Sequence, residues 1–306
     1  MRWAKRGLVY CPDGTRSWAR THAMLPTPLL IDDDVLRVFI TCLDAQGIGR
    51  PGYVDLDARD PTRVVSAGAE PCLDIGRPGT FDENGVAACS VVPASPERLF
   101  MYYVGFELGT KIRYRLLTGL ATSEDGGRTF TRASETPILE RTSAELLFRC
   151  GPFVLPEADR FRLWYVAGST WTDVDGKPMP EYVVRYLESA DGIRWGDSGS
   201  LCIDVEDADE HGFGRPWVRR RGDGYEMFYS VRRRSLRAYR LGYATSPDGR
   251  TWTRDDARMG LDVTPGGFDS AAIMYGAVLD VHGKTYCFYN GDDFGRQGFG
   301  LAELVQ

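Results

Sequence analysis

The stretch Cys150-Gly-Pro-Phe-Val-Leu-Pro-Glu-Ala-Asp-Arg-Phe-Arg-Leu-Trp-Tyr-Val166 decides the fold of this chain. Two short apolar runs flank the polar segment 157–159, and this pattern of aliphatic and aromatic residues around a turn predicts a β-hairpin. In it an aliphatic residue, Val154, precedes an aromatic one, Trp164, by ten positions. The same spacing recurs along the chain at Leu29/Phe39, Val92/Tyr102, Val218/Phe228 and Val278/Phe288.

These hairpins repeat with a nearly constant period. Their first residues lie 63, 62, 64 and 60 positions apart, which indicates five copies of one structural unit. Three units continue into an Asp-Gly turn, in which the Asp side chain can accept hydrogen bonds from the local backbone and Gly tolerates a positive φ. These turns are Ser123-Glu-Asp-Gly126, Ser189-Ala-Asp-Gly192 and Ser246-Pro-Asp-Gly249, and we interpret them as structural.

The repeat predicts an all-β fold, a five-bladed β-propeller of four-stranded antiparallel blades. No linker interrupts the period, so residues 1–306 are expected to form a single domain. The last unit ends after its third strand, and we expect part of the segment 1–25 to supply the missing strand. The third unit carries an insertion, 171–180, whose Asp-Val-Asp-Gly fragment lacks the remaining ligands of a calcium loop and is predicted to be a plain turn.

Composition narrows the classes of protein. A formal net charge of −6 and a pI of about 5.3 argue against binding to nucleic acid or to a membrane surface. The sequence shows neither a signal-peptide core nor a membrane-spanning run, so we expect a cytoplasmic protein. Seven cysteines without a C-x-x-C pair indicate neither a disulfide framework nor a zinc site. We expect a small-molecule ligand and no cofactor, and the oligomeric state is left open.

Charged residues recur just before the first strand of each unit, and Glu145 is one of them. In a propeller these segments enter near the central axis, so equivalent residues should meet around one funnel. Two carboxylates and a proton carrier would suit acid–base chemistry there, and histidine titrates nearest neutral pH. We therefore predict Asp82, Glu83, Asp269, His22 and His211 to be catalytic, and Arg149 and Arg215 to bind the substrate.

A second set of polar residues lies five positions after each hairpin aromatic, where the second strand should end. From this set we predict Asp44, Glu107 and Arg233 to bind the substrate. The plain alternative is that any one of these residues is solvated, because charged side chains at strand ends normally are.

Several motifs carry a resemblance to a known family. The period, the S-x-D-G-x-x-W turns, Phe228-Tyr-Ser230 and Tyr289-Asn290-Gly291 resemble those of the five-bladed propeller glycosidases, the superfamily of arabinanases, xylosidases, invertases and mannoside phosphorylases. This resemblance implies a glycoside hydrolase-like enzyme and adds Asn290 as a substrate-binding candidate. The family carries an Asp at the opening of the first blade, where this chain reads Thr21-His22-Ala-Met-Leu-Pro26. The paired carboxylate roles would then pass to Asp82 or Glu83 and to Asp269.

The chain looks most similar to a bacterial branch associated with sugar biosynthesis, which implies a soluble sugar, a sugar phosphate or a nucleotide-linked sugar as ligand. Arg149, Arg215, Arg232 and Arg233 could hold its anionic part. Two alternatives stay open: a sugar-binding propeller without catalysis, and a lyase, isomerase or transferase that uses the same funnel. His22 and His211 with a carboxylate could hold a divalent ion, but their spacing is not local and we predict no metal site.

Overall fold

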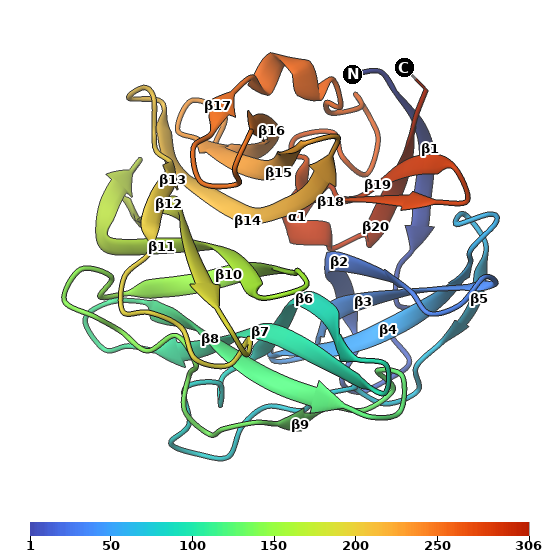
Figure 1. Cartoon of the computed structure of the whole chain (residues 1–306), viewed down its shortest axis with the longest axis horizontal. Helices are drawn as coiled ribbons and strands as arrows, with labels where there is room; N and C mark the ends of the chain where they lie inside the picture. The colour runs from blue at the N-terminus through green and yellow to red at the C-terminus, as the bar shows by residue number, and fades with distance from the viewer. Residues whose placement is uncertain (306) are drawn as a thin grey trace.

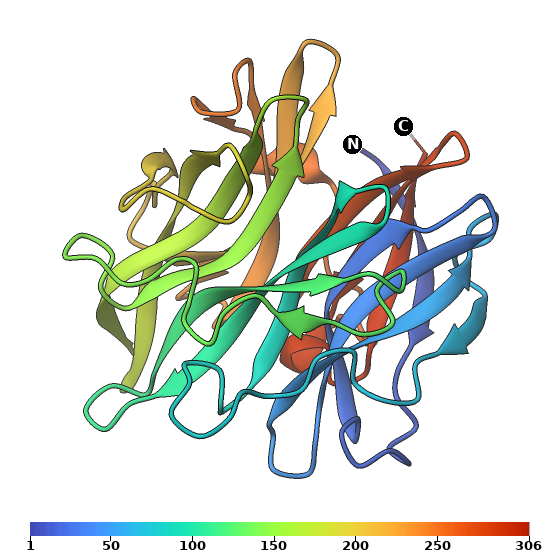
Figure 2. The ribbon, with the colours of Figure 1, turned by 60° about the horizontal axis from the view of Figure 1, so that its bottom comes forward.

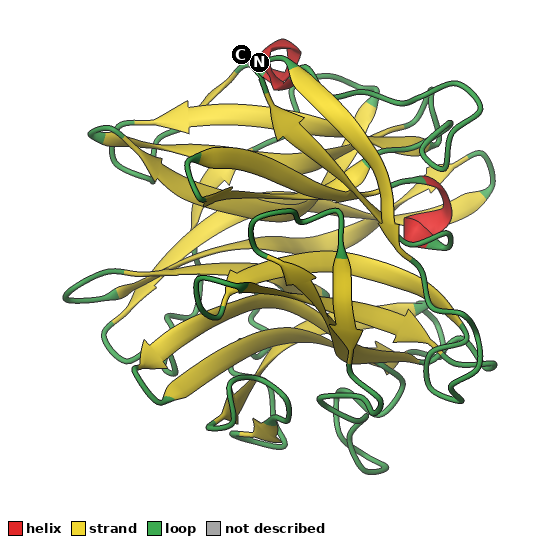
Figure 3. Cartoon of the chain, turned by 90° about the vertical axis from the view of Figure 1, so that its right-hand side faces the viewer, coloured by secondary structure: helices red, strands yellow, loops and turns green. Residues whose placement is uncertain are grey.

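The computed structural model describes residues 1–305, and its regular secondary structure is almost wholly β-strand, connected by loops and turns (Figure 3). Within this range the helical segments are one 3₁₀ turn, Asp256–Met259, and the short helix α1, Asp292–Gly295. The same residues contain no helix long and apolar enough to cross a membrane.

Antiparallel pairing sorts the strands into five consecutive groups of four, which we call the first to fifth groups. The first and second groups contain β2 (Thr21–Leu30), β3 (Val35–Leu43), β4 (Gly49–Asp57) and β5 (Val64–Ala67), then β6 (Val86–Ser95), β7 (Arg98–Leu108), β8 (Tyr114–Ser123) and β9 (Thr131–Arg132). The third and fourth contain β10 (Phe148–Pro156), β11 (Phe161–Val174), β12 (Lys177–Ser189) and β13 (Ser200–Ile203), then β14 (Glu210–Arg221), β15 (Gly224–Arg233), β16 (Ala238–Ser246) and β17 (Thr253–Arg254). The fifth contains β18 (Met274–Val281), β19 (Lys284–Asn290), β20 (Phe299–Leu304) and β1 (Trp3–Tyr10).

The sheets are mixed, because short parallel bridges connect neighbouring groups. Bridges from β8 to β10 and from β12 to β14 join the second, third and fourth groups into a 12-stranded sheet. The expected N-terminal contribution to the last unit is confirmed, since β1 pairs with β20 and Trp3 lies opposite Leu304. The two termini therefore lie side by side (Figures 1 and 2).

The predicted local structures are confirmed. Val154 lies beside Trp164 in the β10–β11 hairpin, one residue out of direct register, and the other hairpin pairs lie on adjacent antiparallel strands as well. In the Asp-Gly turns, the carboxylates of Asp125, Asp191 and Asp248 accept hydrogen bonds from following backbone amides, and the glycines adopt φ values of 73°, 71° and 76°. The turn in the insertion is plain too, with the amide of Gly176 donating to Asp173 at 2.9 Å.

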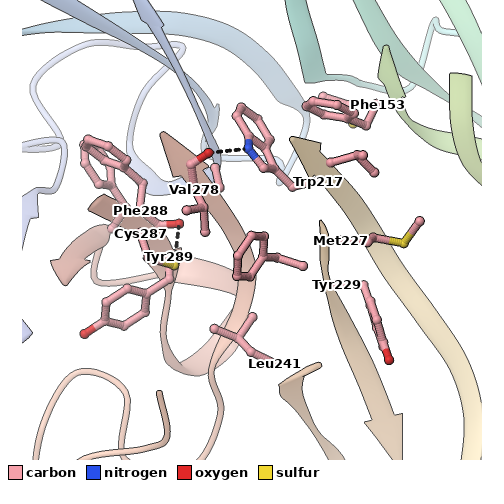
Figure 4. Packing of buried hydrophobic residues seen from close by; sticks show 14 of the residues in the cluster. Phe153, Trp217, Met227, Tyr229, Leu241, Val278, Cys287, Phe288 and Tyr289 are labelled. Atoms are coloured by element: carbon pink, nitrogen blue, oxygen red, sulfur yellow. Dashed lines mark hydrogen bonds between the residues drawn. The ribbon is translucent and has the colours of Figure 1, made fainter. Parts of the chain in front are cut away.

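The core fills the space between groups. Trp217 of β14 lies against Phe153 of β10, with ring centroids 4.8 Å apart, and its indole Nε1 donates to the carbonyl of Val278 in β18 at 2.7 Å (Figure 4). Large aromatic side chains dominate core energetics, and a buried indole N–H needs a partner. This packing ties the third, fourth and fifth groups to one another.

Candidate functional site

The five groups meet at a cavity, which we call the axial cavity and divide into three adjoining parts. Its deep chamber, about 320 Å³, takes one lining residue or more from every group, among them Leu25, Phe106, Tyr182, Arg232 and Tyr275. An outer chamber of about 640 Å³ shares Tyr114, Arg232 and Phe294 with it. A recess of about 100 Å³ lies next to the deep chamber and is lined by Arg215. Size and aromatic lining fit a small-molecule site.

Arg232 is the most unusual side chain of the axial cavity. Arg232 is only 9% exposed, and its guanidinium lies 4.7 Å from the centroid of the Tyr239 ring. Its Nη1 has no hydrogen-bond partner among residues 1–305. None of the carboxylates described in this structure forms an ion pair with it. A buried charge is costly unless it is paired, so this position is prepared for an anion.

Arg215 lies at the junction of several groups and is 1% exposed. Its guanidinium donates to the carbonyl of Pro26 at 2.8 Å, to Oγ1 of Thr27 at 2.7 Å and to the carbonyl of Cys89 at 3.2 Å. Burial lowers its pKa to about 10. These contacts hold three groups together, and they leave Nε without a partner in the described chain. Arg215, which the sequence predicts to bind the substrate, thus lines the axial cavity, but its hydrogen bonds connect strand groups to one another.

His211 is the predicted catalytic residue that lines the outer chamber. It is 3% exposed, and its Nδ1 lies 3.4 Å from the carbonyl of Pro180. Burial, followed by the charge of the nearby Arg232, lowers the pKa of its imidazole to about 4. The ring is therefore neutral at pH 7 and able to accept a proton.

The loop after Asn290 is held by hydrogen bonds and places the aromatic side chain of Phe294 beside both chambers of the axial cavity. Asn290 is buried, accepts a hydrogen bond from the amide of Leu25 at 2.8 Å, and donates to the carbonyls of Ala23 and Gly298 at 2.9 Å. After it, Asp293 and Phe294 adopt left-handed φ values of 50° and 59°. Such backbone strain persists where surrounding contacts enforce it. Asn290 therefore holds the loop that presents the half-exposed Phe294 to both chambers.

The two leading catalytic candidates, Asp82 and Asp269, do not lie where the sequence analysis places them, around one central funnel. Asp82 is fully buried and its Oδ2 accepts from Nε of Arg132 at 2.8 Å, while Asp269, 1% exposed, accepts from Nζ of Lys5 at 2.5 Å. Neither residue lines the axial cavity. Both carboxylates lie in separate ion pairs that fasten the fourth strand of their group. Their predicted catalytic role stays a prediction.

This arrangement recurs in four groups. In the second, third and fifth groups the carboxylate before the first strand lies against a tyrosine of the second strand and a cation: Asp82 with Tyr103 and Arg132, Glu145 with Tyr165 and Arg149, and Asp269 with Tyr289 and Lys5. In the fourth group Arg254 donates to both Glu210, the first residue of β14, and Tyr229, and the hydroxyl of Tyr229 donates to Asp256. We call these the carboxylate clusters. In three of them the tyrosine lies opposite a glycine of the third strand, since a Cβ at Gly119 would stand 2.3 Å from Tyr103, one at Gly242 2.4 Å from Tyr229, and Tyr289 pairs with Gly300.

The other sequence-predicted residues mostly stabilise local structure. Glu83 accepts from the amide of Gly79, Asp44 caps its own turn and binds Arg50, Glu107 pairs with Arg115, and Arg149 and Arg233 belong to carboxylate clusters. His22 contacts Oγ1 of Thr21 at 2.8 Å and lines none of the three parts of the axial cavity. Residues 1–305 bring together no group of three His, Cys, Asp or Glu suited to a metal ion.

Glu145 and Glu210 line a further cavity of about 300 Å³ between the third and fourth groups, which we call the side cavity. It touches the outer chamber through His211. Because Arg254 donates to it, Glu210 has a pKa below its usual value although burial acts in the opposite direction.

The sequence contains signals for the carboxylate clusters that the register of charges alone does not reveal. A tyrosine directly follows the hairpin aromatic in four units, as in Trp164-Tyr165. The segments Arg128-Thr-Phe-Thr-Arg132 and Arg250-Thr-Trp-Thr-Arg254 place the partner arginine at equivalent positions. Arg232, Tyr239, Tyr275 and Phe294 fall outside both patterns, and their meeting depends on the tertiary fold.

Solved structures share this architecture at low sequence identity. A glycoside hydrolase superposes with a TM-score of 0.75 at 20% identity, covering 98% of this chain and 90% of the other. A thermostable family-43 glycoside hydrolase gives 0.69 at 14%, covering 95% and 92%. The GH43_1 enzyme of Xanthomonas citri complexed with xylose gives 0.65 at 12%, covering 97% and 90%. The chain therefore has a glycoside hydrolase-like fold, as the resemblance implied.

A full-length relative shows the family. No family model matches the chain. The uncharacterized protein Rv1502 of Mycobacterium tuberculosis H37Rv is 34% identical over 304 residues, covering 99% of each chain, and protein MT1551 of strain CDC 1551 matches equally. This chain belongs to the Rv1502 family.

Proposed function

We propose that this chain is a sugar-acting protein whose axial cavity binds a sugar carrying an acidic group, either a carboxylate or a phosphate. The observation that carries this proposal is Arg232, a buried guanidinium with no carboxylate partner among the described residues. An anionic substituent would supply the missing charge and accept from Nη1. Charge-assisted hydrogen bonds of this kind are among the strongest available to a ligand.

The aromatic lining of the axial cavity suits a sugar ring as the rest of the ligand. Four aromatic side chains line the deep chamber together with Arg232, namely Tyr114, Tyr239, Tyr275 and Phe294. Aromatic rings pack against the apolar faces of sugar rings, while hydroxyl groups fix the orientation of the ligand. The shared fold with glycoside hydrolases agrees with a sugar ligand. In this proposal the five groups are the blades of a propeller, and the protein acts in the cytoplasm in a biosynthetic pathway.

We assign proton transfer in this cavity to His211. Among residues 1–305, no carboxylate lines the deep chamber, and the one lining the outer chamber, Asp175, is paired with Arg237 at 2.7 Å. His211 is neutral because burial and Arg232 lower its pKa to about 4. An anion on Arg232 would weaken that repulsion and bring the pKa closer to neutral, where a general base works best.

The competing candidate is two-carboxylate glycoside hydrolysis in the side cavity, because Glu145 and Glu210 both line it. That chemistry needs one carboxyl group whose pKa is raised so that it can donate a proton. Both carboxylates of the side cavity are instead held by arginine, Glu145 by Arg149 at 2.6 Å and Glu210 by Arg254 at 2.7 Å, and the pKa of Glu210 is lowered. The axial cavity is therefore the better-supported site.

A thermal-shift experiment tests the binding. Glucuronate, galacturonate and glucose 1-phosphate are compared with glucose and galactose, on wild type, Arg232→Met and the matched control Arg250→Met, a more exposed arginine of the same group. We expect acidic sugars to raise the Tm of wild type and Arg250→Met but not of Arg232→Met, because only ligands that bind the native state stabilise it. Equal stabilisation by neutral sugars, or an unchanged shift in Arg232→Met, would overturn the proposal.

NMR turnover of the protecting sugar then separates the two sites. We expect His211→Asn to lower the rate by about 10² or more per folded molecule, as loss of a positioned base does. Glu145→Gln and Glu210→Gln should retain the rate per folded molecule. Loss in the Glu variants with retention in His211→Asn would instead support hydrolysis in the side cavity. Binding without turnover would identify a sugar-binding protein.

A further inference from the structure

The third group differs from the others in the length of one hairpin. Strands β11 and β12 have 14 and 13 residues, against 10 and 9 for β15 and β16 of the fourth group. The added residues include the insertion 171–180. Its side chains Val174, Lys177, Pro178 and Met179 form one wall of the outer chamber.

Several contacts fix this wall in place. Arg234, from the turn after β15, donates to the carbonyl of Asp173 at 3.1 Å and to Oγ1 of Thr172 at 3.2 Å. Arg237 pairs with Asp175 at 2.7 Å. Trp171 packs edge-on against Tyr114, with ring centroids 5.2 Å apart. The hairpin tip is therefore a fixed part of the outer chamber.

The outer chamber combines positive charge with apolar surface. Arg113, Lys177 and Arg232 line it without an ion pair among the described residues, and its one carboxylate, Asp175, is neutralised by Arg237. The apolar side chains Met179 and Phe294 line it as well, and Phe294 is 41% exposed. A ligand part that is both anionic and apolar would satisfy this lining.

The two chambers also differ in size and charge. The deep chamber, about 320 Å³, has Arg232 as its one charged lining residue, whereas the outer chamber has about 640 Å³ and three further cations. Arg232 belongs to both, so it lies where they join. A ligand with its sugar in the deep chamber would thus place its acidic group at Arg232 and any attached group among the other cations.

We infer that the outer chamber is a second subsite, which takes a phosphate-linked substituent of the sugar. The acidic group at Arg232 is then a phosphate or diphosphate ester, and its aromatic or apolar remainder packs against Met179 and Phe294. A nucleoside and a lipid share this chemistry. The inference rests on the proposed function, since it assumes that the sugar occupies the deep chamber.

Isothermal titration with three probes tests the subsite: inorganic pyrophosphate, uridine diphosphate for a nucleoside, and decyl phosphate, below its micelle-forming concentration, for a lipid. The variant is Arg113→Gln with Lys177→Gln, and the matched control is Arg98→Gln with Lys284→Gln, two exposed cations that line none of the three parts of the axial cavity. All side chains exchanged are surface-exposed, and melting curves verify folding.

We expect at least one organic phosphate to bind more tightly than pyrophosphate, and the Arg113/Lys177 variant to lose about tenfold in affinity for it while the control does not. Which organic phosphate binds identifies the remainder. Affinity for glucuronate should be the same in both variants, because that group binds Arg232. If acidic sugars bind but no organic phosphate does, or if both double variants bind organic phosphate equally, the inference is overturned while the proposed function stands. If neither class of probe binds, both fail.

Discussion

The carboxylate clusters and the axial cavity differ in whether a buried charged side chain has an oppositely charged partner. In the clusters, acids such as Asp82 and Glu210 are buried and each has a cation within 3 Å. In the axial cavity a buried arginine, Arg232, has no acidic partner among the described residues, and it lies over the ring of Tyr239 in a chamber with other aromatic lining residues. The recurring acids of the repeat therefore form ion pairs that stabilise the strand groups. Arg232 is a buried charge that an anionic ligand could neutralise, and this difference separates the carboxylate clusters from the candidate site.

The largest loss of stability is expected at Glu210, which accepts from both Nη atoms of Arg254 at 2.9 and 2.7 Å. Glu210→Gln leaves that arginine and Arg233 without their shared partner, and we expect a loss of about 4 kcal/mol in the free energy of unfolding. Urea denaturation measures it. A variant as stable as wild type would show that the clusters do not hold the fold.

A smaller effect is expected at Lys5, which is partly exposed and bridges β1 to the buried Asp269. Lys5→Met leaves that carboxylate unpaired, and we expect it to lose roughly 2 to 3 kcal/mol. Arg2→Met, at the same end of the chain, serves as a control. Equal losses in the two variants would mean that the Asp269 ion pair itself contributes little.

The space beside each cluster tyrosine gives a third test. A Cβ at Gly119 would lie 2.3 Å from Cζ of Tyr103, so Gly119→Ala should cost about 1 to 3 kcal/mol through overpacking. Gly196→Ala is the control, because its nearest neighbour is a flexible Leu187 methyl at 3.3 Å. Thermal denaturation compares them. If Gly119→Ala melts like the control, Tyr103 is loosely packed and its cluster is less important than proposed.

A further expected effect concerns the pH dependence of stability and lies in the axial cavity. Burial and Arg232 lower the pKa of His211 to about 4 in the native state, below the 6.5 of a free histidine. The unfolded chain then binds more protons between these values, so this histidine contributes stability above pH 6.5 that is lost as pH falls toward 4. We expect His211→Asn to have a shallower decline in stability across this window. An unchanged pH profile would contradict the buried, neutral assignment.

Much of the fold could be predicted from the sequence, because the signals are local. The ten-residue spacing in Val154/Trp164 and the Asp-Gly turns depend on neighbours in the chain, and both are confirmed. The added N-terminal strand also follows from the repeat, since the last unit lacks one. These sequence patterns make the hairpins, the turns and the added strand predictable without a structure.

The candidate site is harder to predict from the sequence, because its residues come from different strand groups and meet only in the tertiary structure. The register singles out Asp82 and Asp269, but burial and a neighbouring cation decide what a carboxylate does, and neither is visible in a single repeat. The sequence indicates Arg232 only as one of several arginines that could bind an anion. What distinguishes it from Arg233, its neighbour on β15, is that Arg233 finds Glu210 at 3.3 Å and Arg232 finds no acid in residues 1–305.

The most direct test compares Asp82→Asn with Arg232→Met in one thermal-shift assay, with and without the acidic sugar that protects wild type. We predict that Asp82→Asn lowers the Tm, through a loss of about 3 kcal/mol, yet keeps the ligand-induced rise, whereas Arg232→Met melts near or above wild type and loses that rise. The sequence register alone predicts the reverse for Asp82, a normal Tm with lost function. If Asp82→Asn melts like wild type and loses ligand binding or turnover, the separation between structural clusters and axial site is contradicted.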